Sequence, residues 1–196
     1  MGVSNSVAHC RRGQANAERA GLNGGVRIEY KDYNAVEGRF DRVVSVGLME
    51  HLPHREYKSY MRKIASSMAD RGIGLIHTIG CNWFKNEHDP FTQKYIFPGS
   101  RQARLSEITG LLERNRLAVL DVENIRQHYG YTVLGWLDKF RRNQPSLDPL
   151  RYDPRFCRMW EYYFACGIAA AFASNSAVFQ VLFTKDYTAA VPLHRV

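Results

Sequence analysis

Two side chains that could do chemistry follow apolar runs of the kind that form strands. The run FDRVVSVG precedes Glu50, and the run GLIHTI at 74–79 carries His77 near its end. Val43, Val44 and Val46 predict a strand buried on both faces. Because the carboxyl ends of parallel strands meet at one sheet edge, we expect Glu50 and His77 to share a ligand-binding crevice there. Alternatively, Glu50 caps the next helix and His77 is a core histidine bonded to backbone.

The elements that must position this pair alternate along the chain. Apolar periodicity predicts helices at 7–20, 55–69, 105–115, 131–142 and 153–172. Shorter apolar or alternating runs predict strands at 26–30, 41–46, 74–79, 117–122 and 177–184. We expect Ser4, Asn5 or Ser6 to cap the first helix. This order predicts a single α/β domain with a doubly wound sheet, and the two consecutive helices before the last strand add a helical cap.

Composition restricts the partners. The 196 residues are 45% hydrophobic and 23% charged, which is typical of one soluble globular domain. The formal net charge of +8 favours an anionic partner such as a phospholipid surface or an acidic metabolite, although solubility alone could explain it. No Lys/Arg block of the nucleic-acid-binding type is present.

The cysteines and the termini point to a reduced, cytoplasmic protein. The four cysteines are Cys10, Cys81, Cys157 and Cys166. They form no CxxC pair, so we expect neither a metal site nor a disulfide framework. The N-terminus has no apolar signal segment, and polar residues interrupt the apolar stretch 162–183, so we expect no membrane span.

Several motifs, in order and spacing, resemble one enzyme family. They are FDRVVSVGLMEHL, LIHTIG, KYIFPG, RQHYGYTVLGW and DPRFCRMWEYY. Together they resemble the cyclopropane-fatty-acyl-phospholipid synthases, which are S-adenosylmethionine-dependent enzymes with a Rossmann-like class I methyltransferase sheet. The resemblance extends from Gly2 to Lys185.

The resemblance implies a reaction on a membrane lipid. The family transfers the sulfonium methyl of S-adenosylmethionine to the double bond of an unsaturated phospholipid acyl chain. A bound bicarbonate then takes a proton from the added methyl as the ring closes. The protein must position the reactants, exclude water and hold the base. The resemblance implies a cytoplasmic protein that contacts the membrane peripherally, and it is consistent with a homodimer.

The resemblance also assigns roles to residues. Glu50 would orient the bicarbonate OH, while His77 and the Tyr129 hydroxyl would hold its oxygens, beside the backbone of Val46 and Ile79. Tyr129 would otherwise be an ordinary half-buried aromatic residue. Cys166 lies near a cysteine of the family that has been considered an active-site candidate, but the match falls one residue away, and Cys166 is alternatively a buried structural thiol.

An aromatic stretch between the second and third motifs has two interpretations. Its side chains include Trp83, Phe84, Phe91, Tyr95 and Phe97. In one interpretation these side chains line a channel for an acyl chain, and the π-faces of their rings stabilise a cation. In the other they only pack within the loop.

The cofactor site is where the chain departs from the family. The family loop D-x-G-C-G-W-G is absent, and so is the cysteine before it. What remains for S-adenosylmethionine is the Ser4-Asn5-Ser6 turn and Asp32-Tyr33 near the adenine, with Val46 at the end of its strand.

The missing loop predicts an incomplete sheet on its N-terminal side. Three explanations stay open: a fragment, a partner chain that supplies the other half, or a homologue that has lost catalysis. We expect the isolated chain to bind S-adenosylmethionine very weakly at best, without turnover. A methyltransferase of small molecules or lipid heads, or a non-catalytic basic module at a membrane surface, is the alternative function.

Overall fold

The computed structural model describes residues 1–22, 24–83, 89–173 and 176–188. The chain forms two compact units, Met1–Phe40 and Asp41–Val196, where the sequence predicts one domain.

The first unit contains a small parallel sheet and one helix. Strand β1 (Gly2–Ser4) pairs in parallel with β2 (Ile28–Tyr30), and α1 (Val7–Arg19) connects them. The Ser6 hydroxyl caps α1 by accepting a hydrogen bond from the His9 amide at 3.3 Å, which confirms one of the three predicted caps. A short helix, η1 (Tyr33–Ala35), follows β2.

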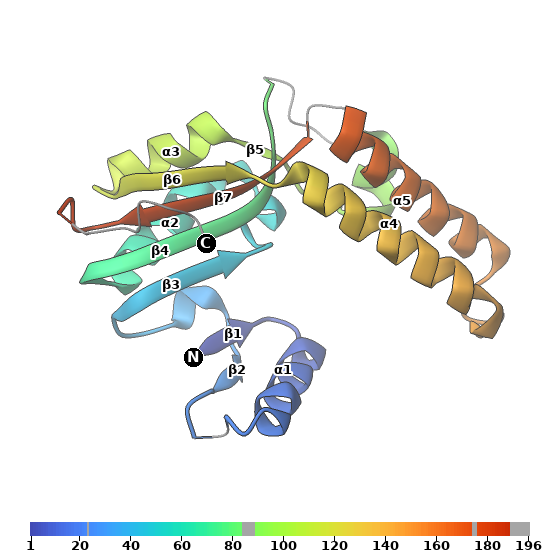
Figure 1. The fold of residues 1–196 in the computed structure, drawn as a ribbon, viewed down its shortest axis with the longest axis horizontal. Helices are drawn as coiled ribbons and strands as arrows, with labels where there is room; N and C mark the ends of the chain where they lie inside the picture. Colours follow the sequence, from blue (N-terminus) through green and yellow to red (C-terminus); the bar gives the residue numbers. More distant parts are fainter. Residues whose placement is uncertain (23, 84–88, 174–175, 189–196) are drawn as a thin grey trace. The chain divides into compact units, whose positions relative to one another are not determined.

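The second unit is built on a five-stranded sheet (Figure 1). Strand order is β3 (Phe40–Val46), β4 (Met68–Cys81), β7 (Ser176–Thr184) and β6 (Ala118–Asn124). Strand β7 is antiparallel to both of its neighbours, and the short β5 (Ala103–Arg104) pairs in parallel with the end of β4. The sheet is therefore mixed.

Helices of this unit pack on the sheet or extend from its end. Their bounds are η2 (Met49–His51), η3 (His54–Glu56), α2 (Tyr57–Ser67), η4 (Thr92–Ile96), α3 (Leu105–Arg114), α4 (Arg126–Asn143), η5 (Gln144–Ser146) and α5 (Pro154–Ala173). The apolar face predicted for α2 is confirmed, because Tyr57, Tyr60 and Ile64 are buried. Helices α4 and α5 form the predicted cap, a hairpin that projects from the end of the sheet (Figure 1). Among the described residues, no helix has the length and apolarity needed to cross a bilayer.

Burial of β3 on both faces was predicted, and this is wrong. The Val44 and Val46 side chains are 63% and 64% exposed. The alternate residue Ser45 faces α2, where its hydroxyl accepts a hydrogen bond from Tyr60 at 2.8 Å. Strand β3 is the last strand of its sheet, so the valines on its other face lack a cover within this unit's described strands and helices.

Strand β4 is longer than predicted and begins at Met68. Gly74 lies inside this strand, as predicted, and makes room there for a ring of the neighbouring strand β7. A Cβ at Gly74 would lie 2.3 Å from the Phe183 ring, so this ring packs directly on the β4 backbone. The strand therefore spans the whole unit and carries both Thr78 and His77.

Candidate active site

Glu50 lies just beyond the end of β3, where the chain turns sharply. Gly47 makes the turn with a φ of +61°, a conformation that favours glycine. The Gly47 amide donates a hydrogen bond to the His77 carbonyl at 3.0 Å, so the turn stays attached to β4. The next residues form η2, and Glu50 in it is only 7% exposed. The sequence thus places a buried carboxylate at a strand end, as predicted.

Two groups of β4 hold the Glu50 carboxylate. The Thr78 hydroxyl donates to Oε2 at 2.6 Å, and the Ile79 amide lies 3.5 Å from Oε1. A buried carboxylate needs such donors, because removing it from water without them is costly. The Arg101 amide also donates to the Glu50 carbonyl at 3.1 Å. These bonds fix the carboxylate as an acceptor at the sheet edge.

Tyr129 lies in the electrostatic environment of Glu50. It is in the first turn of α4, and its pKa is raised by burial and by the negative charge of Glu50. Its hydroxyl has no hydrogen-bond partner among the described residues, while its ring packs edge-on against Trp136. Tyr129 is therefore a protonated phenol with a donor to offer beside a fixed acceptor. The predicted pairing of Glu50 with Tyr129 stays a prediction that this placement favours.

Two further phenols interact electrostatically with members of this pair, Tyr57 with Glu50 and Tyr163 with Tyr129, and sequence reasoning did not select them. Burial raises the pKa of Tyr57 to about 12. The Arg101 cation lowers this pKa, while the negative charges of Glu107 and Glu50 raise it. Burial and the neighbouring Tyr129 raise the pKa of Tyr163 to about 12. Tyr163 lies in the DPRFCRMWEYY motif, so the motif was the signal that could have found it. The site is rich in neutral hydroxyl donors.

His77 does not contact the Glu50 carboxylate in this structure. Successive side chains of a strand point to opposite faces, so His77 lies on the face opposite Thr78. It is directly across from Gln180 of β7, and the two side chains are 3.3 Å apart (Nδ1 to Nε2). Glu50 and His77 therefore lie near each other along the chain paths of η2 and β4, because the Gly47 amide bonds the His77 carbonyl. Their side chains do not form the predicted pair.

An ionic cluster anchors the segment that covers Glu50. Glu107 accepts hydrogen bonds from the Arg101 guanidinium at 2.8 Å and from the Arg104 side chain at 3.2 Å. Burial raises the pKa of Glu107, but the bonds from Arg104 and Arg101 outweigh this and lower it overall. The cluster holds Arg101 in place, and with it the amide that bonds the Glu50 carbonyl.

Cys166 belongs to a different neighbourhood. It is half-buried on α5, one turn beyond Tyr162, and a hydrogen bond between them is the largest cause of a raised Tyr162 pKa. Tyr162 also packs edge-on against Phe91 at 4.7 Å. The structure gives Cys166 no contact with Glu50 among the described residues, and its role stays a prediction.

The aromatic stretch lies against α5. Phe97 packs against Tyr163 at 5.9 Å and against His51 at 5.3 Å. Trp83 is 69% exposed, and Phe84 lies outside the described residues. Apolar rings therefore extend from α5 to η2, the element of Glu50, which is compatible with the predicted acyl channel.

The predicted cofactor residues of the first unit gather at the carboxyl ends of β1 and β2. The Ser4 hydroxyl accepts the Ser6 amide at 3.2 Å, and Asp32 caps η1 by accepting the Asn34 amide at 2.7 Å. Asn5 is exposed, and Tyr33 is half-buried. Since β1 and β2 are parallel, both turns share one edge, which suits an adenosine-type ligand at strand ends. Val46, the sixth predicted residue, belongs to the second unit.

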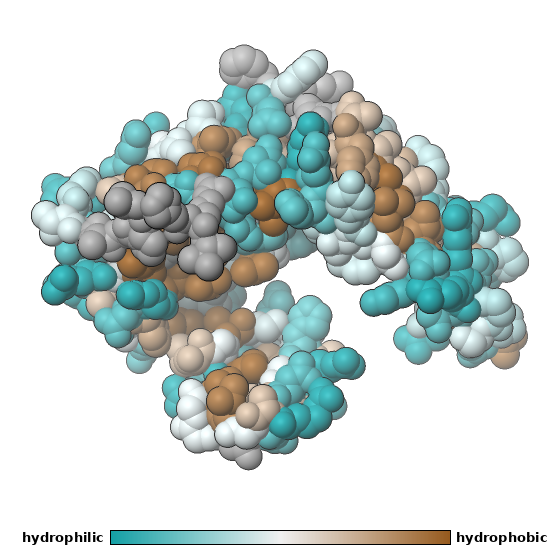
Figure 2. All heavy atoms as spheres, viewed as in Figure 1, coloured by the Kyte–Doolittle hydropathy of each residue, from teal (hydrophilic) through white to brown (hydrophobic). Residues whose placement is uncertain are grey.

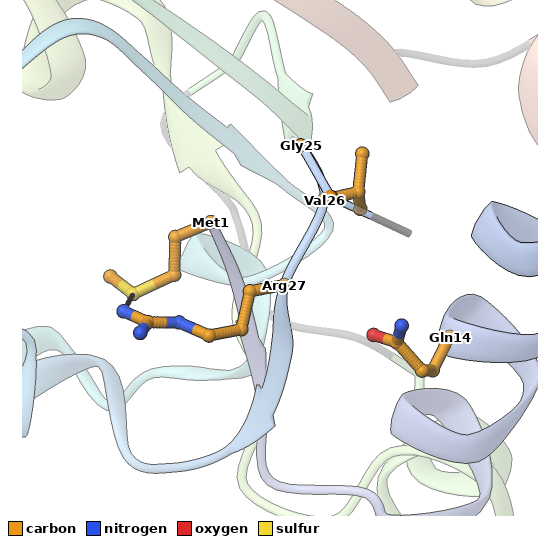
Figure 3. Close-up of a pocket in the computed structure, with 6 residues that line it drawn as sticks. Met1, Gln14, Gly25, Val26 and Arg27 are labelled. Carbon is orange, nitrogen blue, oxygen red and sulfur yellow. Dashed lines mark hydrogen bonds between the residues drawn. The ribbon is translucent and has the colours of Figure 1, made fainter. Parts of the chain in front are cut away.

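A pocket of about 580 Å³ occurs at the other end of these strands (Figure 3). Its lining residues are Met1, Gln14, Gly24, Gly25, Val26 and Arg27. The Arg27 guanidinium donates to the Met1 sulfur at 3.5 Å there. Because Met1 and Arg27 precede β1 and β2, this hollow is separate from the predicted cofactor edge. Among the described residues, no cluster of three or more His, Cys, Asp or Glu could hold a metal.

The fold and the strand-end site define a class I methyltransferase architecture. The chain superposes on the mycolic acid cyclopropane synthase CmaA1 complexed with SAH and CTAB with a TM-score of 0.82 at 18% identity, covering 93% of this chain and 68% of CmaA1. The family model "Mycolic acid cyclopropane synthetase" matches residues 1–181, and the chain belongs to this family.

Two characterised relatives resemble the chain in sequence. It is 31% identical over 185 residues to the cyclopropane-fatty-acyl-phospholipid synthase of Escherichia coli K12, covering 94% of this chain and 47% of that enzyme. It is 32% identical over 171 residues to the tuberculostearic acid methyltransferase UfaA1 of Mycobacterium tuberculosis, covering 83% of this chain and 39% of that protein. The chain thus spans about half or less of the length of these relatives.

Proposed function

We propose that this chain forms the part of an S-adenosylmethionine-dependent enzyme that acts on the double bond of unsaturated phospholipid acyl chains and produces cyclopropane fatty acids. The observation that carries the proposal is the buried Glu50 carboxylate, which accepts a hydrogen bond from Thr78 at 2.6 Å and whose charge contributes to the raised pKa of the Tyr129 phenol. Membership of the cyclopropane synthetase family supports it. The enzyme works at the surface of a membrane, on its cytoplasmic side.

Glu50 and Tyr129 suit a small hydroxylated anion such as bicarbonate. A fixed carboxylate accepts the hydrogen bond of a bicarbonate OH, and a phenol with a raised pKa donates to its oxygens. Within the described part of the chain the Tyr129 hydroxyl has no hydrogen-bond partner, so it can donate to an added acceptor. His77 joins this set only if its side chain leaves Gln180.

The residues of this chain prepare the proton transfer. S-adenosylmethionine, when bound, supplies an electrophilic methyl, and the electrons of the alkene form the new carbon–carbon bond. The rings of Tyr163 and Phe97, which pack on each other at 5.9 Å, would exclude water from the resulting cation. Glu50 would hold the bicarbonate by accepting a hydrogen bond from its OH, and Tyr129 would donate to its oxygens; the bicarbonate would supply the base for a proton of the added methyl, whose C–H electron pair forms the last ring bond. Within the first unit, Ser4–Ser6 and Asp32–Tyr33 are the residues that would hold the cofactor, and the same role for Val46 of the second unit is a separate proposal.

The competing function is methyl transfer without ring closure. One relative is named for tuberculostearic acid methylation, so a methyl branch is the product to distinguish from a ring. Both reactions start with the same bond formation, and the fate of the proton decides between them.

The test is product analysis in a protein that joins this chain to the part of the E. coli synthase outside the matched region. It is incubated with S-adenosylmethionine carrying a labelled methyl, bicarbonate and unsaturated phosphatidylglycerol. We expect label in cyclopropane ring protons by NMR. Label in a methyl branch favours the competing function, and label on a head-group N or O contradicts both.

A further inference from the structure

A second pocket lies between η4 and the first turns of α5, apart from the Glu50 site. Its volume is about 230 Å³, and it is lined by Phe91, Tyr95, Arg155, Arg158 and Met159. Arg155, Arg158 and Met159 are three and four residues apart, so they share one face of α5. Two guanidinium groups therefore line a small hollow whose other walls are aromatic or thioether side chains.

The charge of this pocket is positive. Arg155 and Arg158 are exposed, and no carboxylate of the described residues forms an ion pair with either. Lys94 adds a third cation, with its Nζ 5.2 Å from the centre of the Tyr95 ring. The pKa of Tyr95 is lowered, first by its hydrogen bond with Lys94 and also by Arg155. The nearby Asp89 carboxylate is occupied, because it accepts hydrogen bonds from the Thr92 hydroxyl and from two backbone amides.

Guanidinium pairs of this kind recognise phosphate. Each planar guanidinium offers parallel N–H donors that match two phosphate oxygens. The apolar side chains beside them suit the glycerol and upper acyl carbons that adjoin a lipid phosphate, whereas a free phosphate would leave them unused. The surface of the α4–α5 hairpin is hydrophilic at its far end and more apolar nearer the sheet (Figure 2). A phospholipid has the same sequence of a polar phosphate followed by apolar acyl carbons.

The pocket connects to the Glu50 site along α5. Phe91 of the pocket contacts Tyr162, and Met159 is one turn before Tyr163. Tyr163 in turn interacts electrostatically with Tyr129, and the charge of Glu50 contributes to the raised pKa of Tyr129. With a rise of about 1.5 Å per residue, Arg155 is about 12 Å from Tyr163 along the helix axis. A chain leaving the pocket would follow these rings towards Glu50.

We propose that the pocket formed by Arg155, Arg158, Phe91, Tyr95 and Met159 binds the phosphodiester of the phospholipid substrate and directs its acyl chain along α5 to Glu50. The identity of the ligand as a lipid rests on the proposed function. The binding itself requires neither cofactor nor turnover, so it is tested separately from the reaction.

The experiment measures binding of monomeric dihexanoyl phosphatidylglycerol to the 196-residue chain by calorimetry or NMR titration. Dihexanoylglycerol, which lacks the phosphate, and inorganic phosphate are the comparison probes. The test variant is Arg155→Gln with Arg158→Gln. The control variant is Arg141→Gln with Arg142→Gln, which removes the same charge from the same hairpin, where Arg141 pairs with Glu161 and Arg142 with Asp138.

We expect the phospholipid to bind more tightly than either comparison probe. The pocket variant should weaken this binding about tenfold or more, since bidentate charged hydrogen bonds are lost, and the control variant by less than about twofold. Unchanged far-UV circular dichroism and melting temperature show that both variants are folded. Equal losses in the two variants, or equal binding of dihexanoylglycerol, overturn the proposal. Inorganic phosphate binding as tightly as the lipid overturns the lipid assignment, even if methyl transfer to phospholipid is observed.

Discussion

The Thr78 hydroxyl donates a 2.6 Å hydrogen bond to the Glu50 carboxylate, and both residues are buried. The pair joins the end of β3 to the middle of the sheet, across 28 residues of sequence. A short hydrogen bond to a charged acceptor is among the stronger ones in proteins. It fixes the carboxylate that the proposed function requires.

Replacing Thr78 with valine tests this bond. Thr78→Val leaves a buried carboxylate oxygen without its donor, so the free energy of unfolding should fall by about 1–3 kcal/mol. Thr78→Ser keeps the hydroxyl and should lose less. Urea denaturation followed by circular dichroism measures both. Equal stability of the valine variant and the parent would show that the bond is unimportant.

A second prediction compares two buried tyrosines of α2. The Tyr57 hydroxyl is buried without a hydrogen-bond partner among the described residues, whereas the Tyr60 hydroxyl donates to Ser45 at 2.8 Å. Tyr57→Phe should therefore leave stability unchanged or raise it by about 1–3 kcal/mol. Tyr60→Phe should lower it by about 1 kcal/mol. Thermal unfolding checks the signs, and a clear loss in Tyr57→Phe would contradict the structure.

Two glycines give opposite predictions. A Cβ at Gly80 would lie 2.5 Å from the Ala103 carbonyl and 2.8 Å from the Phe179 ring, so Gly80→Ala should destabilise by about 1–3 kcal/mol. At Gly110, within α3, nothing lies within 4 Å of the new Cβ. Gly110→Ala should stabilise by about 0.5–1 kcal/mol. Chemical denaturation distinguishes them, and the same sign for both would refute the packing around β5.

The buried phenols predict a loss of stability in alkali. Tyr57 and Tyr163 keep their protons to about pH 12, while the unfolded chain loses them near its ordinary pKa of 10. Between these values the unfolded chain binds fewer protons, so the free energy of unfolding falls as the pH rises. Tyr163→Phe should make this fall shallower, and Tyr131→Phe, which removes an exposed phenol, should not. Urea titrations across this range would contradict the account if both variants matched the parent.

Local patterns predicted the elements well. The Ser6 cap and the buried face of α2 depend on residues within one or two turns, so periodicity and capping preferences were sufficient to predict them. The strand-end argument supplied Glu50 and the family resemblance supplied Tyr129, and the structure places the two within electrostatic reach of each other.

Long-range packing decided what sequence could not predict. Val44 and Val46 are exposed because α2 packs on the opposite face of β3, at Ser45, and a valine run alone does not reveal which face of a strand is covered. His77 faces Gln180, a partner 103 residues away that an antiparallel register sets. Thr78 was not predicted as a site residue, because the adjacent His77 was taken as the candidate. Since successive side chains of a strand point to opposite faces, only one of the two can face Glu50, and this is Thr78.

The most direct test of the proposed function is the rate at which labelled methyl enters unsaturated phosphatidylglycerol, measured in the protein joined to the remaining part of the E. coli synthase. Glu50→Gln should reduce this rate about a hundredfold or more, since it removes the carboxylate that orients the base. Glu56→Gln changes a half-buried carboxylate of the neighbouring η3, whose ion-pair partner is the exposed Arg55, and should leave the rate within about twofold. A Glu50→Gln protein that labels the lipid as fast as the parent would contradict the assignment of Glu50 and the proposed function built on it.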